Sequence, residues 1–106
     1  MSKGYWIGRV DVHDEQAYRA YIEAAGPIFA EHGARFLVRG GTYVAGEGQA
    51  RARNVVIEFP SYEAALSCYR SDGYQRARLL RTPVSDGEVV IVEGHDGGDG
   101  LSAAAP

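Results

Sequence analysis

Four short stretches of the chain alternate apolar and polar residues, and this period of two predicts four β-strands. The stretches are residues 5–12, 35–41, 54–59 and 88–93. In the second stretch, Gly40-Gly41 allows a bend or a bulge before Thr42-Tyr43-Val44 resumes the extended pattern. Residues 45–52 then form a glycine-containing hairpin connection to the third strand. The last stretch is apolar at both alternating positions, which is typical of a strand buried on both faces.

Two further regions have apolar residues at helical spacing. The first predicts a helix that begins at His13-Asp14-Glu15, is kinked by Pro27 and closes at Gly33. Its inward residues are spaced i, i+4, i+7 and i+11: Tyr18, Ile22, Ala25 and Phe29. The second predicts a helix over residues 62–70, followed by a further helical turn or two over residues 74–80. Its inward residues are Tyr62, Ala65, Leu66 and Tyr69.

The order of these elements is β-α-β-β-α-β. It predicts an α+β fold, with a ferredoxin-like antiparallel sheet and both helices on one face. A length of 106 residues corresponds to one domain, which we place at residues 1–94. Residues 95–106 are rich in glycine, aspartate and alanine, so we expect a disordered low-complexity tail there.

The amino-acid composition indicates which binding partners and which cellular compartment are compatible with this chain. The net charge of −3 argues against a nucleic-acid partner, because such proteins usually carry a basic stripe. The single cysteine, Cys68, cannot form an intramolecular disulfide, which fits a reducing compartment. The N-terminus has no apolar signal region, and no run approaches the roughly 20 apolar residues of a membrane span. We therefore expect a soluble, cytoplasmic protein without a membrane partner.

Helices on one side leave the other face of the predicted sheet uncovered. Alternation places large apolar residues there together with charged ones: Tyr5, Ile7, Leu37, Val56 and one side of the last strand, with Arg9, Asp11, Arg39 and Glu58. Monomers rarely expose an apolar patch of this size. A second copy of the chain, packed through the same face about a twofold axis, would cover it, so we expect a homodimer.

Four segments of the chain resemble one known family. They are Tyr5-Trp-Ile-Gly-Arg-Val-Asp-Val12, Gly33-Ala-Arg-Phe-Leu-Val-Arg-Gly-Gly41, Val55-Val-Ile-Glu-Phe-Pro-Ser61 and Tyr69-Arg-Ser-Asp-Gly-Tyr74, in the order that the domain-of-unknown-function 1330 family shows. The resemblance covers residues 3 to 94 and implies a dimeric α+β barrel. That superfamily includes cofactor-free monooxygenases, muconolactone-type isomerases, haem-handling enzymes and ligand-sensing domains, so the resemblance implies no single activity.

Arg39 with Glu58 and Arg9 forms the strongest candidate site, because alternation places all three on the uncovered face. An arginine there could hold a carboxylate or an enolate while Glu58 moves a proton. Gly40 could let the backbone approach a ligand. An ion-pair network across neighbouring strands explains the same charged residues without a ligand. Both interpretations stay open on the sequence alone.

The sequence predicts no metal site and no cofactor. His13, His32 and His95 have no paired spacing, and neither a His-x-x-x-His nor a Cys-x-x-Cys pattern occurs. Cys68 lies among apolar residues of the second predicted helix, where no base near it in the sequence would activate its thiol. We interpret it as a small core residue.

Three functions are compatible with these features. The first is a small dimeric barrel that binds an anionic or polar organic molecule in a cleft between sheet and helices, near Arg39. The second is a cofactor-independent monooxygenase or isomerase that uses Glu58 and Arg39. The third is a structural or sensory dimer without chemistry. Oxygen uptake would identify an oxygenase, whereas a binding protein would only gain thermal stability with its ligand.

Overall fold

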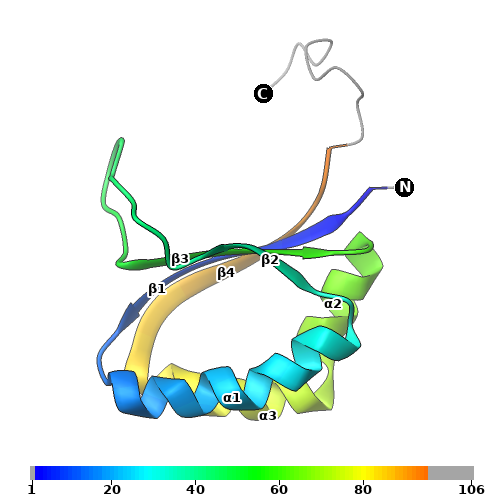
Figure 1. Ribbon diagram of the computed structural model, residues 1–106, viewed down its shortest axis with the longest axis horizontal. Helices are drawn as coiled ribbons and strands as arrows, with labels where there is room; N and C mark the ends of the chain where they lie inside the picture. The colour runs from blue at the N-terminus through cyan, green and yellow to red at the C-terminus, as the bar shows by residue number, and fades with distance from the viewer. Residues whose placement is uncertain (1, 96–106) are drawn as a thin grey trace.

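The computed structural model describes residues 2–95, which form a four-stranded antiparallel sheet and three α-helices. In chain order the elements are β1 (Gly4–Val12), α1 (Glu15–Glu31), β2 (Arg35–Arg39), β3 (Arg53–Phe59), α2 (Tyr62–Arg70), α3 (Asp72–Arg81), a short 3-10 helix (Thr82–Val84) and β4 (Ser85–Glu93). The strand order is β2-β3-β1-β4. The helices all lie on one side of the sheet (Figure 1).

This architecture confirms the predicted α+β, ferredoxin-like fold. The order is β-α-β-β-α-α-β, because the helical turns expected after residues 62–70 form a helix of their own. The tail expected at residues 95–106 lies outside the described residues, except for His95. None of the described helices combines the length and the apolarity that are needed to cross a membrane.

Helix α1 has the predicted start and end, and it continues through Pro27. The Asp14 side chain accepts a hydrogen bond of 3.0 Å from the Ala17 amide and so caps the helix. Pro27 lies inside the helix, one residue after Gly26. Gly33 closes the helix with a φ of 75°. The buried residues are Tyr18, Tyr21, Ala25 and Phe29, with Ile22 half-buried.

The rest of the helical layer is divided at Ser71. Its hydroxyl donates a hydrogen bond of 2.7 Å to the Cys68 carbonyl and accepts one of 3.2 Å from the Tyr74 amide. One side chain therefore closes α2 and caps α3. As a result, α3 is a full helix of 10 residues rather than the expected turn or two.

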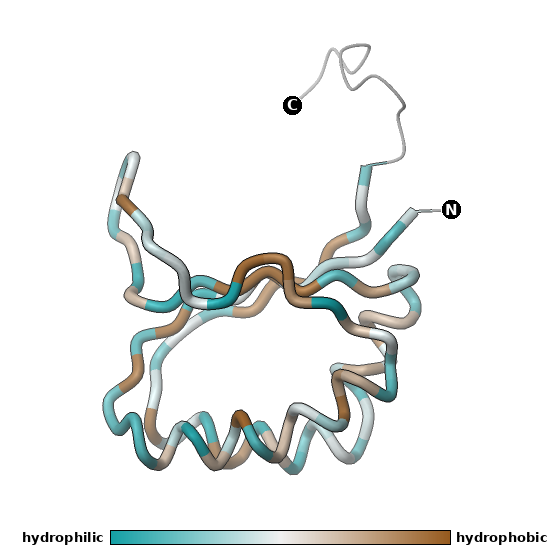
Figure 2. Tube along the Cα trace, viewed as in Figure 1, coloured by the Kyte–Doolittle hydropathy of each residue, from teal (hydrophilic) through white to brown (hydrophobic). Residues whose placement is uncertain are grey.

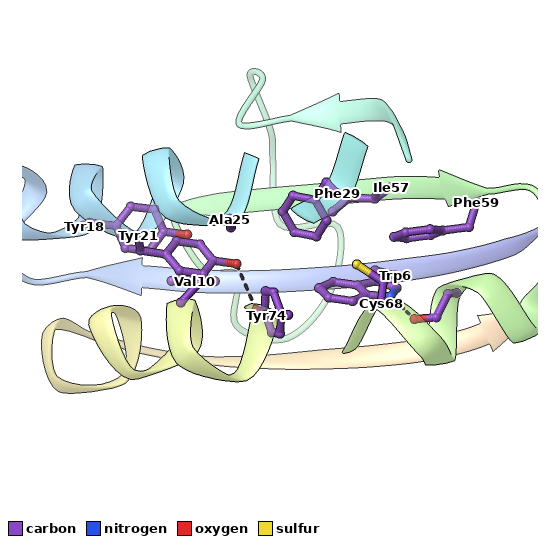
Figure 3. Close-up of a cluster of buried hydrophobic side chains, with 12 residues drawn as sticks. Trp6, Val10, Tyr18, Tyr21, Ala25, Phe29, Ile57, Phe59, Cys68 and Tyr74 are labelled. Carbon is purple, nitrogen blue, oxygen red and sulfur yellow. Dashed lines mark hydrogen bonds between the residues drawn. The ribbon is translucent and has the colours of Figure 1, made fainter. Parts of the chain in front are cut away.

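Aromatic rings line the space between helices and sheet, and Trp6, Phe29 and Phe59 gather at one end of it (Figure 3). Trp6 of β1 packs edge to face against Phe29 and Tyr74, with ring centroids 5.1 and 4.9 Å apart. The Trp6 indole N–H donates a hydrogen bond of 2.9 Å to the Ala65 carbonyl, which satisfies its polar atom. Trp6 and Tyr74 are buried, so this end of the layer is closed to solvent.

Strand β2 departs from the predicted pattern. A β-bulge lies between Phe36 and Val38, not at Gly40-Gly41. Gly40 has a φ of 71°, which turns the chain out of the strand. The extended segment expected at Thr42-Tyr43-Val44 pairs with no strand among the described residues. Residues 40–52, which we call the arm, instead project from the sheet on the side away from the helices (Figure 1).

The sheet face opposite the helices, which we call the uncovered face, is apolar in its middle. Ile7 of β1 pairs with Val90 of β4, and Val56 of β3 pairs with Val38 of β2. Ile7, Val38 and Val90 are 40%, 41% and 55% exposed. Figure 2 shows hydrophobic segments running along the sheet as well as along the helices. In the single chain, β4 is therefore open on its outer side rather than buried on both faces.

Candidate functional site

A cavity lies between the sheet and the helices, beside the closed aromatic end of the core. Its volume is about 60 Å³, and its walls come from all four strands and from α1 and α3. Buried Trp6 and Tyr74 belong to its inner wall, whereas Arg39 is exposed and belongs to its open side. The lining side chains that carry a charge or a hydroxyl are those of Arg39, Arg53, Arg81, Tyr18, Tyr21 and Tyr74.

The bulge in β2 turns Arg39 toward this cavity. Phe36 pairs with Ile57 and Arg39 pairs with Val55, and all four line the cavity. Residues three apart in a regular strand face opposite sides, but the extra residue of a bulge brings them to the same side. The prediction that Arg39 lies on the uncovered face is therefore wrong. Its actual position, at a cavity between sheet and helices, is where the first functional hypothesis expects a ligand.

Two further arginines line the cavity, each with a buried nitrogen. The Nε atoms of Arg53 and Arg81 have no hydrogen-bond partner among the described residues. The guanidinium carbons lie 5.7 Å from the Tyr18 ring centroid and 5.5 Å from that of Tyr21, respectively. A Cβ at Gly40 would come within 3.0 Å of Arg53 Nη1, so this glycine leaves room for an arginine of the cavity. A buried donor without a partner costs about 1–3 kcal/mol, which an acceptor atom of a ligand would recover.

The tyrosine hydroxyls of the cavity can donate hydrogen bonds. The hydroxyl oxygens of Tyr21 and Tyr74 lie 2.9 Å apart, as the dashed line in Figure 3 marks. Burial raises the pKa of Tyr21 far above its ordinary value, and the neighbouring Tyr74 adds to this shift. Burial also raises the pKa of Tyr18. Because one hydroxyl of a bonded pair donates to the other, the second keeps its own proton for a ligand.

Arg81 is charged at any physiological pH. Burial disfavours its charged form, but the hydroxyls of Tyr74 and Tyr21 outweigh this effect and raise its pKa. Among the described residues that line the cavity there is no Asp, Glu, His, Lys or Cys. The cavity therefore offers positive charge and hydroxyl protons, and no side chain that would remove a proton at neutral pH.

Glu58 and Arg9 do not join Arg39. Both lie on the uncovered face, as predicted, and the bulge separates Arg39 from them. Glu58 accepts a hydrogen bond of 3.2 Å from the Tyr5 hydroxyl. Arg9 donates one of 2.8 Å to the Gln49 carbonyl at the base of the arm. The expected cluster of these three residues is therefore wrong.

The uncovered face has a charged cluster of a different composition. Arg51, at the base of the arm, lies 2.8 Å from Asp11 and 2.6 Å from Glu88, and Arg9 lies 3.7 Å from Glu88. The hydrogen bonds from Arg51 lower the pKa of Glu88, and the Ala52 amide lowers that of Asp11. These side chains line an open hollow of about 510 Å³. Because its charges pair with one another, this hollow has the features of an ion-pair network, and the helix–sheet cavity is the better candidate site.

The histidines and the cysteine lie outside the cavity. His13 Nε2 is 2.7 Å from Asp86, and His32 Nδ1 is 2.9 Å from the Ile28 carbonyl oxygen. In the part of the chain that is described, no group of three or more His, Cys, Asp or Glu side chains is placed to hold a metal ion. Cys68 is buried, and burial raises the pKa of its thiol to about 12.

Arg53 and Arg81 were not predicted as site residues from the sequence. Alternation in β3 extends from Val55 back to Arg53, and Arg81 follows Tyr74 by two helical turns, so both residues fall on inward faces. These signals are weak, because a long arginine at the end of an apolar face usually reaches solvent with its head group. Only the packed structure shows that the Nε atoms stay buried.

Residues 3–95 match the sequence model of a family described as Domain of unknown function (DUF1330). No curated protein matches the chain. Among solved structures, a protein of unknown function from Rhodopseudomonas palustris is 18% identical and has a TM-score of 0.72, over 91% of this chain and 85% of that one.

Two other solved structures share the fold. SnoaB, a cofactor-independent oxygenase from Streptomyces nogalater, is 11% identical with a TM-score of 0.64, over 93% of this chain and 99% of that one. A dimeric ferredoxin-like protein of unknown function from Jannaschia sp. is 14% identical with a TM-score of 0.61, over 89% and 99% of the two chains. Identities this low show a common fold alone.

Proposed function

The chain belongs to the DUF1330 family, and on that premise we propose that it binds a small anionic organic molecule in the cavity between its sheet and its helices. The observation that carries this proposal is the convergence of Arg39, Arg53 and Arg81 on one cavity. Two of them have a buried Nε without a hydrogen-bond partner among residues 2–95. Carboxylate oxygens are the acceptors that these donors lack. A guanidinium fork also matches the geometry of a carboxylate better than an ammonium group does.

A cofactor-independent oxygenase or isomerase acting through Glu58 and Arg39 has less support. These two residues lie on opposite faces of the sheet, so one molecule in one chain cannot contact both. SnoaB, an oxygenase of similar fold, supports such chemistry only through the fold. Binding of an anion needs donors and positive charge, which is what the cavity offers.

The test uses Trp6, the single tryptophan of the chain, which lines the cavity. Titration of the wild type with propionate should change Trp6 fluorescence and raise the melting temperature. Arg53→Met and Arg81→Met should each weaken binding at least tenfold, about 1.4 kcal/mol. The matched control is Arg76→Met, which removes an exposed arginine from the same helix as Arg81 and should bind like the wild type. The proposal fails if no small carboxylate affects the wild type, or if binding survives both cavity substitutions.

We further propose a homodimer formed through the uncovered face. Exposed Ile7, Val38 and Val90 on one sheet face support it, since pairing with a second copy would remove them from water. The arm rises on the same side of the sheet and could extend along the partner (Figure 1). The Jannaschia protein of similar fold is described as dimeric.

A further inference from the structure

The polar end of the cavity restricts the head group of a ligand. Within the described part of the chain the Nε–H groups of Arg53 and Arg81 have no partner, and the Tyr21–Tyr74 pair adds its remaining hydroxyl proton. No carboxylate lines the cavity among the described residues, so an ammonium group would meet only positive charge and donors. A head group that fits this end of the cavity is negatively charged, accepts several hydrogen bonds and carries no ammonium group. Amines and zwitterionic amino acids are thereby disfavoured.

The apolar end restricts the rest of the ligand. The cavity of about 60 Å³ is less than half of the roughly 150 Å³ that accommodates benzene in a protein core. Its inner wall includes Trp6, Phe29 and Tyr74, whose rings pack edge to face on one another. Such close-packed walls do not expand without loss of contacts. The enclosed part of the ligand is therefore a short hydrocarbon group, smaller than a benzene ring.

We infer that the cavity selects short-chain monocarboxylates, with the carboxylate toward Arg53 and Arg81 and the hydrocarbon part between the aromatic wall and Gly26 of α1. This inference rests on the proposed anion binding. It adds the orientation of the ligand in the cavity and an upper limit on the size of its hydrocarbon part. Gly26 lines the cavity, and a Cβ built on it meets no atom within 4 Å. The space beside this part of α1 is thus available to a ligand methylene, and equally to a methyl group introduced by substitution.

The first experiment is a chain-length series on the wild type, with Trp6 fluorescence as the readout. Acetate, propionate, butyrate, hexanoate and benzoate are compared at equal ionic strength and pH 7. Affinity should rise about fourfold per methylene over the short acids, the equivalent of about 0.8 kcal/mol per buried CH₂. It should then fall at least tenfold for hexanoate and benzoate. Butylamine and alanine, which match the short acids in size, should produce no saturable change.

The second experiment is Gly26→Ala, which adds one methyl group to the cavity wall. Because one methylene in an apolar pocket changes affinity by about 10–200-fold, butyrate binding should drop at least tenfold while acetate binding is retained. Gly46→Ala is the matched control, since its Cβ also meets no atom within 4 Å but lies on the arm, outside the cavity. This control should keep the chain-length profile of the wild type. Circular dichroism verifies that both variants fold.

The possible results separate the inference from the proposed function. If no acid of any length binds, anion binding itself is wrong. If the acids bind through Arg53 and Arg81 but hexanoate and benzoate bind as tightly as propionate, anion binding stands and the size limit is overturned. If the length limit holds in the wild type but is unchanged in Gly26→Ala, the position of the hydrocarbon part beside α1 is overturned. Should Gly26→Ala fail to fold, the wild-type series alone decides the size limit.

Discussion

Arg39 and Phe36 stand three residues apart on one strand, yet both face the helices. The Arg39 guanidinium carbon lies 4.1 Å from the Phe36 ring centroid, within cation–π distance. This contact exists because the bulge between Phe36 and Val38 shifts the alternation of β2 by one residue. The planar guanidinium is thereby stacked on an aromatic wall, at the open side of the cavity.

The contact predicts that lysine cannot replace Arg39. Arg39→Lys keeps the charge but loses the planar fork and its stacking on Phe36, so propionate binding should weaken about tenfold. Arg39→Met should weaken binding at least as much. Arg39 is exposed, so both substitutions should change the free energy of unfolding by less than about 0.5 kcal/mol. Isothermal titration measures the change in affinity, and urea unfolding measures the change in stability. Full affinity for propionate in Arg39→Lys would contradict binding of the carboxylate through two hydrogen bonds from the Arg39 guanidinium.

The dimer proposal predicts an effect of charge at Val90. Val90→Asp places a carboxylate on the uncovered face, where it would be buried without a partner in the dimer, so the molecular mass in light scattering should fall to that of a monomer. Leu79→Asp is the matched control, because Leu79 is 62% exposed on α3, away from that face. This variant should keep the mass of the wild type. A monomeric mass for the wild type at micromolar concentration would contradict the proposed homodimer.

The charged cluster at the base of the arm predicts a loss of stability in acid. Asp11 and Glu88 have a lowered pKa in the folded chain, so the unfolded chain takes up protons first as the pH falls. Their contribution to the free energy of unfolding is present above the ordinary carboxylate pKa of about 4, and it is lost below it. Arg51→Met removes the shared partner and should flatten this pH dependence. Urea unfolding between pH 7 and 3 measures it, with exposed Arg70→Met as the control.

Cys68 should be unreactive in the folded chain. Burial raises the pKa of its thiol to about 12, so at pH 8 very little thiolate is present, and the side chain is inaccessible. A thiol reagent such as DTNB should therefore react only as fast as the chain unfolds, and added urea should accelerate the reaction. Rapid labelling without denaturant would mean that α2 opens locally.

Gly4 should not tolerate a side chain. A Cβ at this position would lie 2.5 Å from the Ser61 carbonyl oxygen, at the start of α2. Gly4→Ala should lower the free energy of unfolding by about 1–3 kcal/mol, as overpacking does. Gly46→Ala, which meets no neighbouring atom, should change it little. The midpoint of urea unfolding distinguishes the two variants.

Most of the predicted helix and strand positions agree with the structure because they depend on local rules. Asp14 caps α1 and Gly33 closes it through interactions within a few residues, so the sequence pattern suffices. The break after residue 70 was expected, but the full length of α3 was not, because a serine that both closes one helix and caps the next resembles an ordinary turn. The candidate site was predicted less well: the sequence singled out Arg39 but gave it the wrong face and the wrong neighbours.

The sequence by itself determined the α+β fold, the single core and the apolar, partly charged face of the sheet, since the periods of two and 3.6 residues encode which side chains avoid water. Only the tertiary structure decided where Arg39 points. A bulge is an offset between two paired strands, and alternation along one strand cannot reveal it. Packing likewise decided that the Nε atoms of Arg53 and Arg81 are buried without a partner in the described part of the chain. Whether a buried donor finds an acceptor depends on groups that lie far away in the sequence.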